Sequence, residues 1–284
     1  MTPDGHQAQL EWEDRVGRPA AAAAIGSAVL TVVSVAVQIG AYQDVGDTDR
    51  ARLIAIDDNA GQIWAAIGIR DVGIVLLAFV LWFLYRTTRY RTPLPGILLP
   101  LIPLAPVLLI AASIINQSDI VSIASEFVDE GEQKETRAEN LADDLTPVGS
   151  ALGVGGTLAL ALALLLISLN AMRAGLLSRF MGIIGIITGA LLVLPLAPIP
   201  VVQVFWLGAL GALFLDRWPG GRGPAWETGE AEPWPSAAQL RAEAVGDQLR
   251  DRPDPDPGPA PEPGPEPQGP EHPTSKKRKR KRRR

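Results

Sequence analysis

Residues 148–169, VGSALGVGGTLALALALLLISL, carry no ionisable side chain and are predominantly apolar. At about 1.5 Å of rise per residue, an α-helix over this stretch is roughly 33 Å long. That length crosses the ~30 Å hydrocarbon core of a bilayer. The apolar residues also follow one another in a run instead of recurring at the amphipathic spacing of a soluble helix. The stretch therefore predicts a membrane-spanning helix.

Further apolar runs occur on both sides of this stretch, so we predict an all-α, polytopic membrane helix bundle with six transmembrane helices. The proline-rich segment 195–200 alone separates the last two runs, and the final run is short. A tight helical hairpin is the simplest interpretation of that pair. The alternative is four spans plus a re-entrant hairpin that never fully crosses. The further runs are residues 20–41, 64–85, 97–115, 178–196 and 199–215.

Arginines near the ends of these helices gather on one side of the predicted bundle. Cationic loops are retained in the cytoplasm, so that side is expected to be cytoplasmic. Both chain ends fall on it, which predicts cytoplasmic N- and C-termini. The arginines concerned are Arg15, Arg18, Arg86, Arg89, Arg91, Arg173, Arg179, Arg217 and Arg222.

The two longer connections on the opposite side, residues 42–63 and 116–147, contain many acids and few cations. Apolar residues recur in them near helical spacing, which indicates helices that project beyond the membrane. We expect one helix to start near Asp49, one to run on to about Glu130, and one to start near Glu135. The predicted result is an acidic helical collar outside the bilayer.

The remaining segments are polar. We expect residues 1–18 to be a cytoplasmic N-terminal segment, 19–218 to be the bundle, and 219–250 to be a cytoplasmic juxtamembrane segment with a short helix over 237–250. Residues 251–284 are rich in proline and cannot bury enough apolar area to offset chain entropy, so a disordered tail is predicted.

Arg70 and Asp71 lie within the second apolar run, where an ionised side chain is costly unless it is paired or faces a polar interior. Neighbouring helical residues point about 100° apart, so we expect partners from other helices. Two interpretations stay open: a polar cavity on a solute or proton pathway, or a structural hydrogen-bond cluster with an arginine that reaches outward. The predicted intramembrane polar cluster is Gln38, Arg70, Asp71, Asn116, Gln117 and Gln203.

Proline and glycine mark several of the predicted helices. Pro100, Pro103 and Pro106 each remove a backbone donor, so a kinked or broken third helix is expected. Small residues at four-residue spacing, such as Gly185 and Gly189, favour close helix packing. That packing could occur within one chain or in a homo- or hetero-oligomer.

The chain ends in a run of basic residues although its formal net charge is −5. Each basic residue gains about 1 kcal/mol near an anionic cytoplasmic surface, so contact with anionic lipid headgroups is one hypothesis. A passive solubilising tail is the alternative, and nucleic acid is a weaker rival. The residues are Lys276, Lys277, Arg278, Lys279, Arg280, Lys281, Arg282, Arg283 and Arg284.

The composition argues against most enzyme chemistry. The chain has no cysteine and two histidines, and both histidines lie in polar terminal segments. We expect no catalytic residue, metal site or cofactor, because no nucleophile–base pair, metal-ligand cluster or paired carboxylates fall in the helical core. The first hypothesis is a non-enzymatic scaffold or sensor in the lipid bilayer. The second is a small transporter or channel subunit with a polar site near Arg70 and Asp71.

Residues 171–185, AMRAGLLSRFMGIIG, are followed by Phe205-Trp206-Leu207 and by WPGGRGPAW at 218–226. This pattern resembles uncharacterised multi-pass membrane proteins of actinobacterial type, a family of unknown function. The resemblance covers residues 15 to 235 and excludes the tail. It implies a bacterial plasma membrane and brings no known activity.

Overall fold

The computed structural model describes residues 3–42, 45–130, 132–142, 146–194, 200–219 and 221–234. Every regular element in these ranges is an α-helix. Four of the helices are long and apolar enough to cross a membrane, which makes this a membrane-embedded helical protein. They are α1 (Pro3–Ala41), α3 (Ala60–Arg91), α4 (Leu98–Asp129) and α6 (Pro147–Arg173).

The last two apolar runs form the shorter helices α7 (Arg179–Val193) and α8 (Val201–Phe214). With 15 and 14 residues they are roughly 21 to 22 Å long, less than the ~30 Å hydrocarbon core. The structure thus supports four spans by length, and six crossings stay a prediction.

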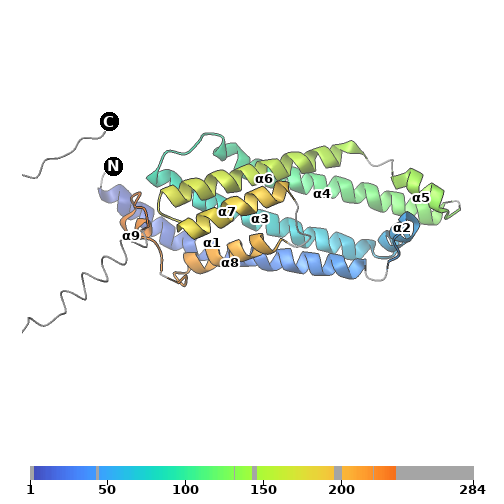
Figure 1. Ribbon diagram of the computed structural model, residues 1–284, viewed down its shortest axis with the longest axis horizontal. Helices are drawn as coiled ribbons and strands as arrows, with labels where there is room; N and C mark the ends of the chain where they lie inside the picture. The colour runs from blue at the N-terminus through green and yellow to red at the C-terminus, as the bar shows by residue number, and fades with distance from the viewer. Residues whose placement is uncertain are drawn as a thin grey trace, which may run out of the picture. The chain divides into compact units, whose positions relative to one another are not determined.

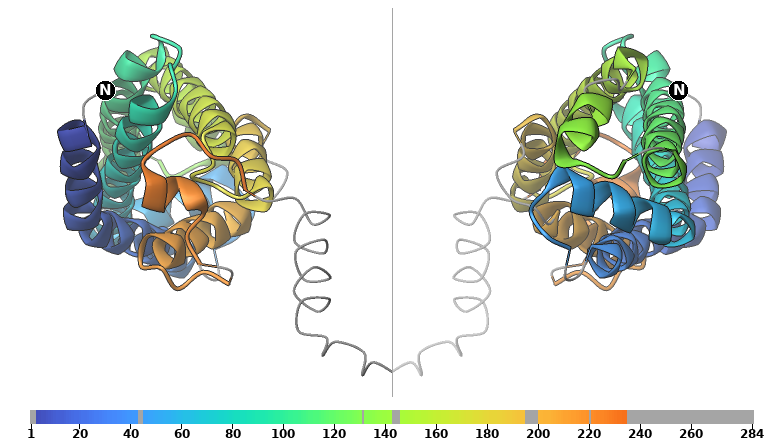
Figure 2. Two further views of the ribbon diagram at one scale, coloured as in Figure 1. Left: turned by 90° about the vertical axis from the view of Figure 1, so that its left-hand side faces the viewer. Right: turned by 90° about the vertical axis from the view of Figure 1, so that its right-hand side faces the viewer.

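The six apolar helices pack in a ring. α1 contacts α3, α3 contacts α4, α4 contacts α6, α6 contacts α7, α7 contacts α8, and α8 returns to α1. α3 also contacts α6 across the ring. The views along the bundle in Figure 2 show this closed arrangement.

The largest core cluster fills one end of the ring. It includes residues of α3 from Leu77 to Tyr85, residues of α6 from Ala159 to Ala171, and the fully buried Trp206 and Phe214 of α8. The short helix α9 (Pro224–Thr228) covers this end, which we call the α9 end (Figure 1). Trp226 of α9 packs on Phe83 and donates from Nε1 to the carbonyl of Leu176 at 2.9 Å.

The opposite end carries the predicted collar, made of α2 (Asp49–Asp58), α5 (Glu135–Ala142) and the last turns of α4. Leu53, Ile56, Phe127 and Ala138 form a small separate core there. Glu135 accepts the backbone N–H of Asp49 at 2.8 Å, which caps α2. The same core includes Ala41 of α1 and Ile63 of α3, so the collar is packed onto the ends of the ring helices.

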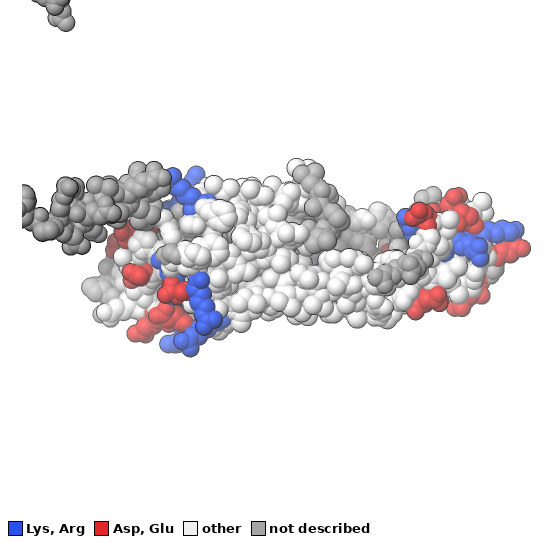
Figure 3. Space-filling view, turned by 60° about the horizontal axis from the view of Figure 1, so that its bottom comes forward, with Lys and Arg blue, Asp and Glu red and all other residues white. Residues whose placement is uncertain are grey.

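Charged residues are unevenly distributed over the surface of the bundle. On the face drawn in Figure 3, lysine, arginine, aspartate and glutamate gather at the two ends, with an uncharged band between them. Large apolar side chains such as Val29, Val107 and Leu158 are exposed along the long helices. Exposed apolar side chains in an uncharged band are typical of a surface solvated by lipid tails.

Several boundaries differ from the sequence-based expectations. Residues 3–18, expected to be a cytoplasmic N-terminal segment, are helical and continue into the first apolar run as α1, with Pro19 inside the helix. The helix expected from Asp49 is interrupted at Asn59, and the one expected from Glu135 ends at Ala142. α4 reaches Asp129, close to the expected Glu130.

Of the expected kink or break in the third apolar run, the break is wrong, because α4 continues as one helix through Pro103 and Pro106, and the kink stays a prediction. Membrane helices tolerate proline where neighbouring helices and side chains satisfy the freed backbone groups. The predicted helix over 237–250, the tail and the basic run lie outside the described residues.

Candidate functional site

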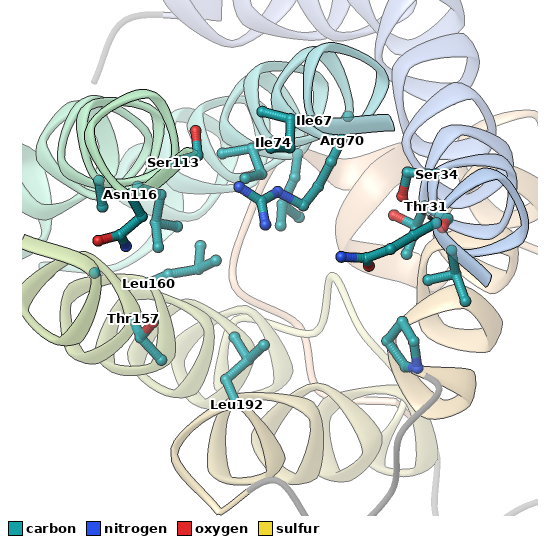
Figure 4. Close-up of a pocket in the computed structure, with 18 of the residues that line it drawn as sticks. Thr31, Ser34, Ile67, Arg70, Ile74, Ser113, Asn116, Thr157, Leu160 and Leu192 are labelled. Carbon is teal, nitrogen blue, oxygen red and sulfur yellow. Dashed lines mark hydrogen bonds between the residues drawn. The ribbon is translucent and has the colours of Figure 1, made fainter. Parts of the chain in front are cut away.

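A cavity of about 530 Å³ lies inside the helix ring, between the core cluster and the collar. All six ring helices, or residues at their ends, contribute to its wall (Figure 4). Its volume is within the ~300–1,000 Å³ typical of small-molecule pockets. Its polar wall residues are Thr31, Ser34, Gln38, Arg70, Ser113, Asn116, Gln117, Thr157 and Gln203.

Arg70 projects from α3 into this cavity (Figure 4). Its side chain is 47% exposed. A guanidinium carries five N–H donors. Among the described residues, the one hydrogen bond it makes is from Nη2 to Asp71 Oδ1, at 3.4 Å. Most of its hydrogen-bonding capacity is therefore available to whatever occupies the cavity.

Asp71 is turned toward α4 and lies behind the cavity wall. Its Oδ2 accepts a hydrogen bond from Ser113 Oγ at 2.7 Å. The expected partner from another helix is therefore present for Asp71. The long side chain of Arg70 also contacts Asp71, its neighbour in the same helix, although the two residues point about 100° apart.

The structure brings five of the predicted polar residues to one cavity. Gln38, Arg70, Asn116, Gln117 and Gln203 all line it. The sequence-based reasoning did not include Thr31, Ser34, Ser113 and Thr157, which complete the polar wall. Thr31, Ser34 and Gln38 recur at helical spacing on α1, and this periodicity in the sequence could have identified Thr31 and Ser34 as part of the site. Ser113 and Thr157 are single hydroxyl residues in apolar runs, and no sequence pattern identifies them as site residues.

Gln117 is a buried amide of the polar wall. It is 8% exposed, and its Nε2 has no hydrogen-bond partner among the described residues. A buried donor without a partner costs about 1–3 kcal/mol. Because Nε2 itself has almost no accessible surface, this unsatisfied donor lies within the wall and does not face the cavity.

The cavity is amphipathic along the bundle axis. Leu77, Leu109 and Leu160 close it on the side of the core cluster, and we call these three residues the leucine floor. Because α1 and α4 run toward the collar, Gln38, Asn116 and Gln117 lie on the collar side. Arg70 lies between the two zones, seven residues along α3 from Leu77, or about 10 Å.

A second arginine provides a structural contrast. Arg91, at the α9 end, is 0% exposed and uses its guanidinium fully, with bonds to the Glu13 carboxylate and to the carbonyls of Thr87 and Ala225. Arg91 thus has the partners expected of a buried structural arginine. Arg70 does not.

No group of three or more metal-ligating side chains occurs among the residues placed by the structure. No protein-family model, curated protein or solved structure matches this chain.

Proposed function

We propose that the protein binds a small solute inside the membrane, as a small transporter or channel subunit or as a ligand sensor. The observation that carries the proposal is the cavity around Arg70. Placing an arginine at this depth costs several kcal/mol unless it is paired or hydrated. A single 3.4 Å contact to Asp71 compensates little of that cost, so a water-filled or ligand-filled cavity is the natural reason for its position.

The topology belongs to the same proposal. We propose that α7 and α8 form a hairpin that completes six crossings, with the α9 end in the cytoplasm of a bacterial cell and the collar outside. The arginine-rich helix ends support this orientation. Residues 276–284 are proposed to contact anionic lipid headgroups from the cytoplasmic side.

A cysteine-accessibility experiment tests the cavity, because the chain has no cysteine of its own. Thr157 and Leu158 are neighbours on α6, but Thr157 lines the cavity and Leu158 is an exposed apolar residue of the outer surface. In membrane vesicles, we expect Thr157→Cys to react with a water-soluble charged thiol reagent. We expect Leu158→Cys to remain unmodified, because lipid surrounds it.

Unreactive Thr157→Cys in a folded protein would mean that the cavity is closed to water, and the binding proposal would then fail. Reactivity at both positions would contradict the assignment of the α6 surface to lipid. The first result would leave the second candidate, a non-enzymatic scaffold that presents the collar as a contact surface. The separate core of the collar supports that candidate.

A further inference from the structure

We propose that the cavity takes an anionic amphiphile from the outer leaflet, with its acidic group at Arg70 and its hydrocarbon part over the leucine floor. This inference rests on the proposed function and adds the chemical class of the ligand. The shared chemistry is a carboxylate or phosphate group attached to an apolar chain.

The charge of the cavity wall indicates which polar group the ligand carries. Arg70 is the one ionisable residue among the described wall residues. A guanidinium binds carboxylate and phosphate oxygens through parallel, charge-assisted hydrogen bonds. A cationic ligand would be repelled by Arg70, and a neutral ligand would leave its charge without a counter-ion.

The distribution of polar and apolar residues along the cavity indicates the shape of the ligand. Most polar residues of the wall lie at the level of Arg70 or toward the collar, where Ile67 and Ile120 also line the cavity. The leucine floor closes the cavity toward the middle of the bundle, with Thr157 at the level of Leu109. An amphiphile that enters from the outer leaflet has this orientation already, with its headgroup outward and its chain toward the bilayer centre. A small soluble anion would gain nothing from the leucine floor.

The short helices supply a lateral route. α7 ends at Val193, and its Leu192 already lines the cavity. α6 continues from Thr157 to Pro147, about 15 Å further toward the collar. Among the described helices, α7 and α8 therefore reach less far toward the collar than α6 does (Figure 1). Val154 and Leu158, both exposed, follow the cavity residues Gly153 and Thr157 on α6, so apolar side chains adjoin the cavity residues on this helix.

Protection of a cavity cysteine tests the inference. Full-length Thr157→Cys, in nanodiscs of zwitterionic lipid, is labelled with an uncharged maleimide in the presence of oleate, phosphatidylglycerol, oleyl alcohol or acetate. We expect oleate or phosphatidylglycerol to slow labelling, and the two identify a free carboxylate or a phospholipid as the source. Oleyl alcohol and acetate should have no effect. Ser122→Cys, exposed on the collar side of α4, serves as the control site and should label equally in every arm.

Arg70→Gln separates the anionic claim from the cavity itself. In that background, protection should need a roughly tenfold or higher concentration of the amphiphile, because a charged hydrogen-bond partner is lost. Arg70→Lys should retain part of the protection. Equal protection by oleyl alcohol, protection by acetate, or protection unchanged in Arg70→Gln would overturn the inference. Failure of Thr157→Cys to label without any ligand would instead overturn the proposed function.

Discussion

At the scale of single residues, two arginines of the same helix have opposite environments. Arg91 Nη1 and Nη2 donate to the two carboxylate oxygens of Glu13 at 2.6 and 2.9 Å. Its Nε and Nη2 also donate to the carbonyl of Ala225, at 3.0 and 2.7 Å. This ion pair joins α1, α3 and α9 in a site that excludes water. Arg70 makes one long contact among the described residues, so most of its N–H groups remain available to a ligand.

Neutralising Glu13 should destabilise the protein strongly. In Glu13→Gln, the buried Arg91 keeps its charge but loses its counter-ion. Breaking a buried pair on one side costs about 3–5 kcal/mol, because an uncompensated charge stays buried. Thermal unfolding in detergent, followed by tryptophan fluorescence, measures the change.

Asp14→Asn is the matched control for this prediction. Asp14 is the next residue, its side chain is 78% exposed, and it pairs with Arg222 at 3.4 Å. Exposed pairs contribute about 0–1 kcal/mol, so its melting temperature should stay close to that of the parent protein. Similar losses in the two variants would argue that the Glu13 pair has no special role.

At the scale of helices, glycines set how closely α6, α7 and α8 approach. A Cβ placed on Gly189 would lie 2.8 Å from the carbonyl oxygen of Ala161, which is backbone and cannot turn away. A Cβ on Gly185 would overlap Ser168 and the indole of Trp206. The sequence left open whether these glycines serve the monomer or an oligomer. The structure places both at contacts within one chain.

Gly189→Ala should therefore separate α7 from α6. We expect a loss of about 1–3 kcal/mol, the usual cost of overpacking a closely packed contact. The control is Gly208→Ala on α8, where nothing lies within 4 Å of the added Cβ. Alanine in a helix is favoured over glycine by roughly 0.5–1 kcal/mol, so the control should be neutral or stabilised. Chemical denaturation of both variants in mild detergent decides between these outcomes.

At the scale of the whole molecule, the face drawn in Figure 3 has an uncharged middle and charged ends. The two ends differ from each other. The α9 end combines arginines with tryptophans: Arg86 lies over the ring of Trp12 at 4.1 Å and near Trp82. Aromatic belts of this kind occur at membrane interfaces. The collar end is mainly acidic and has its own small core. This asymmetry is what gives the protein a preferred orientation in the proposed topology.

The orientation can be measured in intact cells. Single cysteines replace Ser122, on the collar side of α4, or Glu227, in α9; both positions are exposed. We expect a membrane-impermeant thiol reagent to label Ser122→Cys in intact cells, and Glu227→Cys only after the membrane is permeabilised. The reverse pattern would show that the collar faces the cytoplasm and would remove the outer-leaflet route proposed for the ligand.

The sequence anticipated much of this architecture and part of the candidate site. Ionisable and amide side chains inside apolar runs are visible in a single chain, so Gln38, Arg70 and Gln203 stood out before any fold was known. Their convergence on one cavity was only a hypothesis, because residues of different helices meet through packing. Thr157 and the leucine floor had no distinguishing local pattern, since isolated threonines and leucines are ordinary in membrane helices.

The sequence by itself determined that this is a helical membrane protein with charged ends, because solvation by lipid depends on contiguous apolar runs along the chain. Only the tertiary structure decided where α2 and α3 separate, that α9 is held by the Arg91–Glu13 pair, and that the ring encloses a cavity. The physical reason is that these features depend on which helices become neighbours. Glu13, Arg91 and Ala225 are far apart in the chain, and no local property of any of them specifies the others.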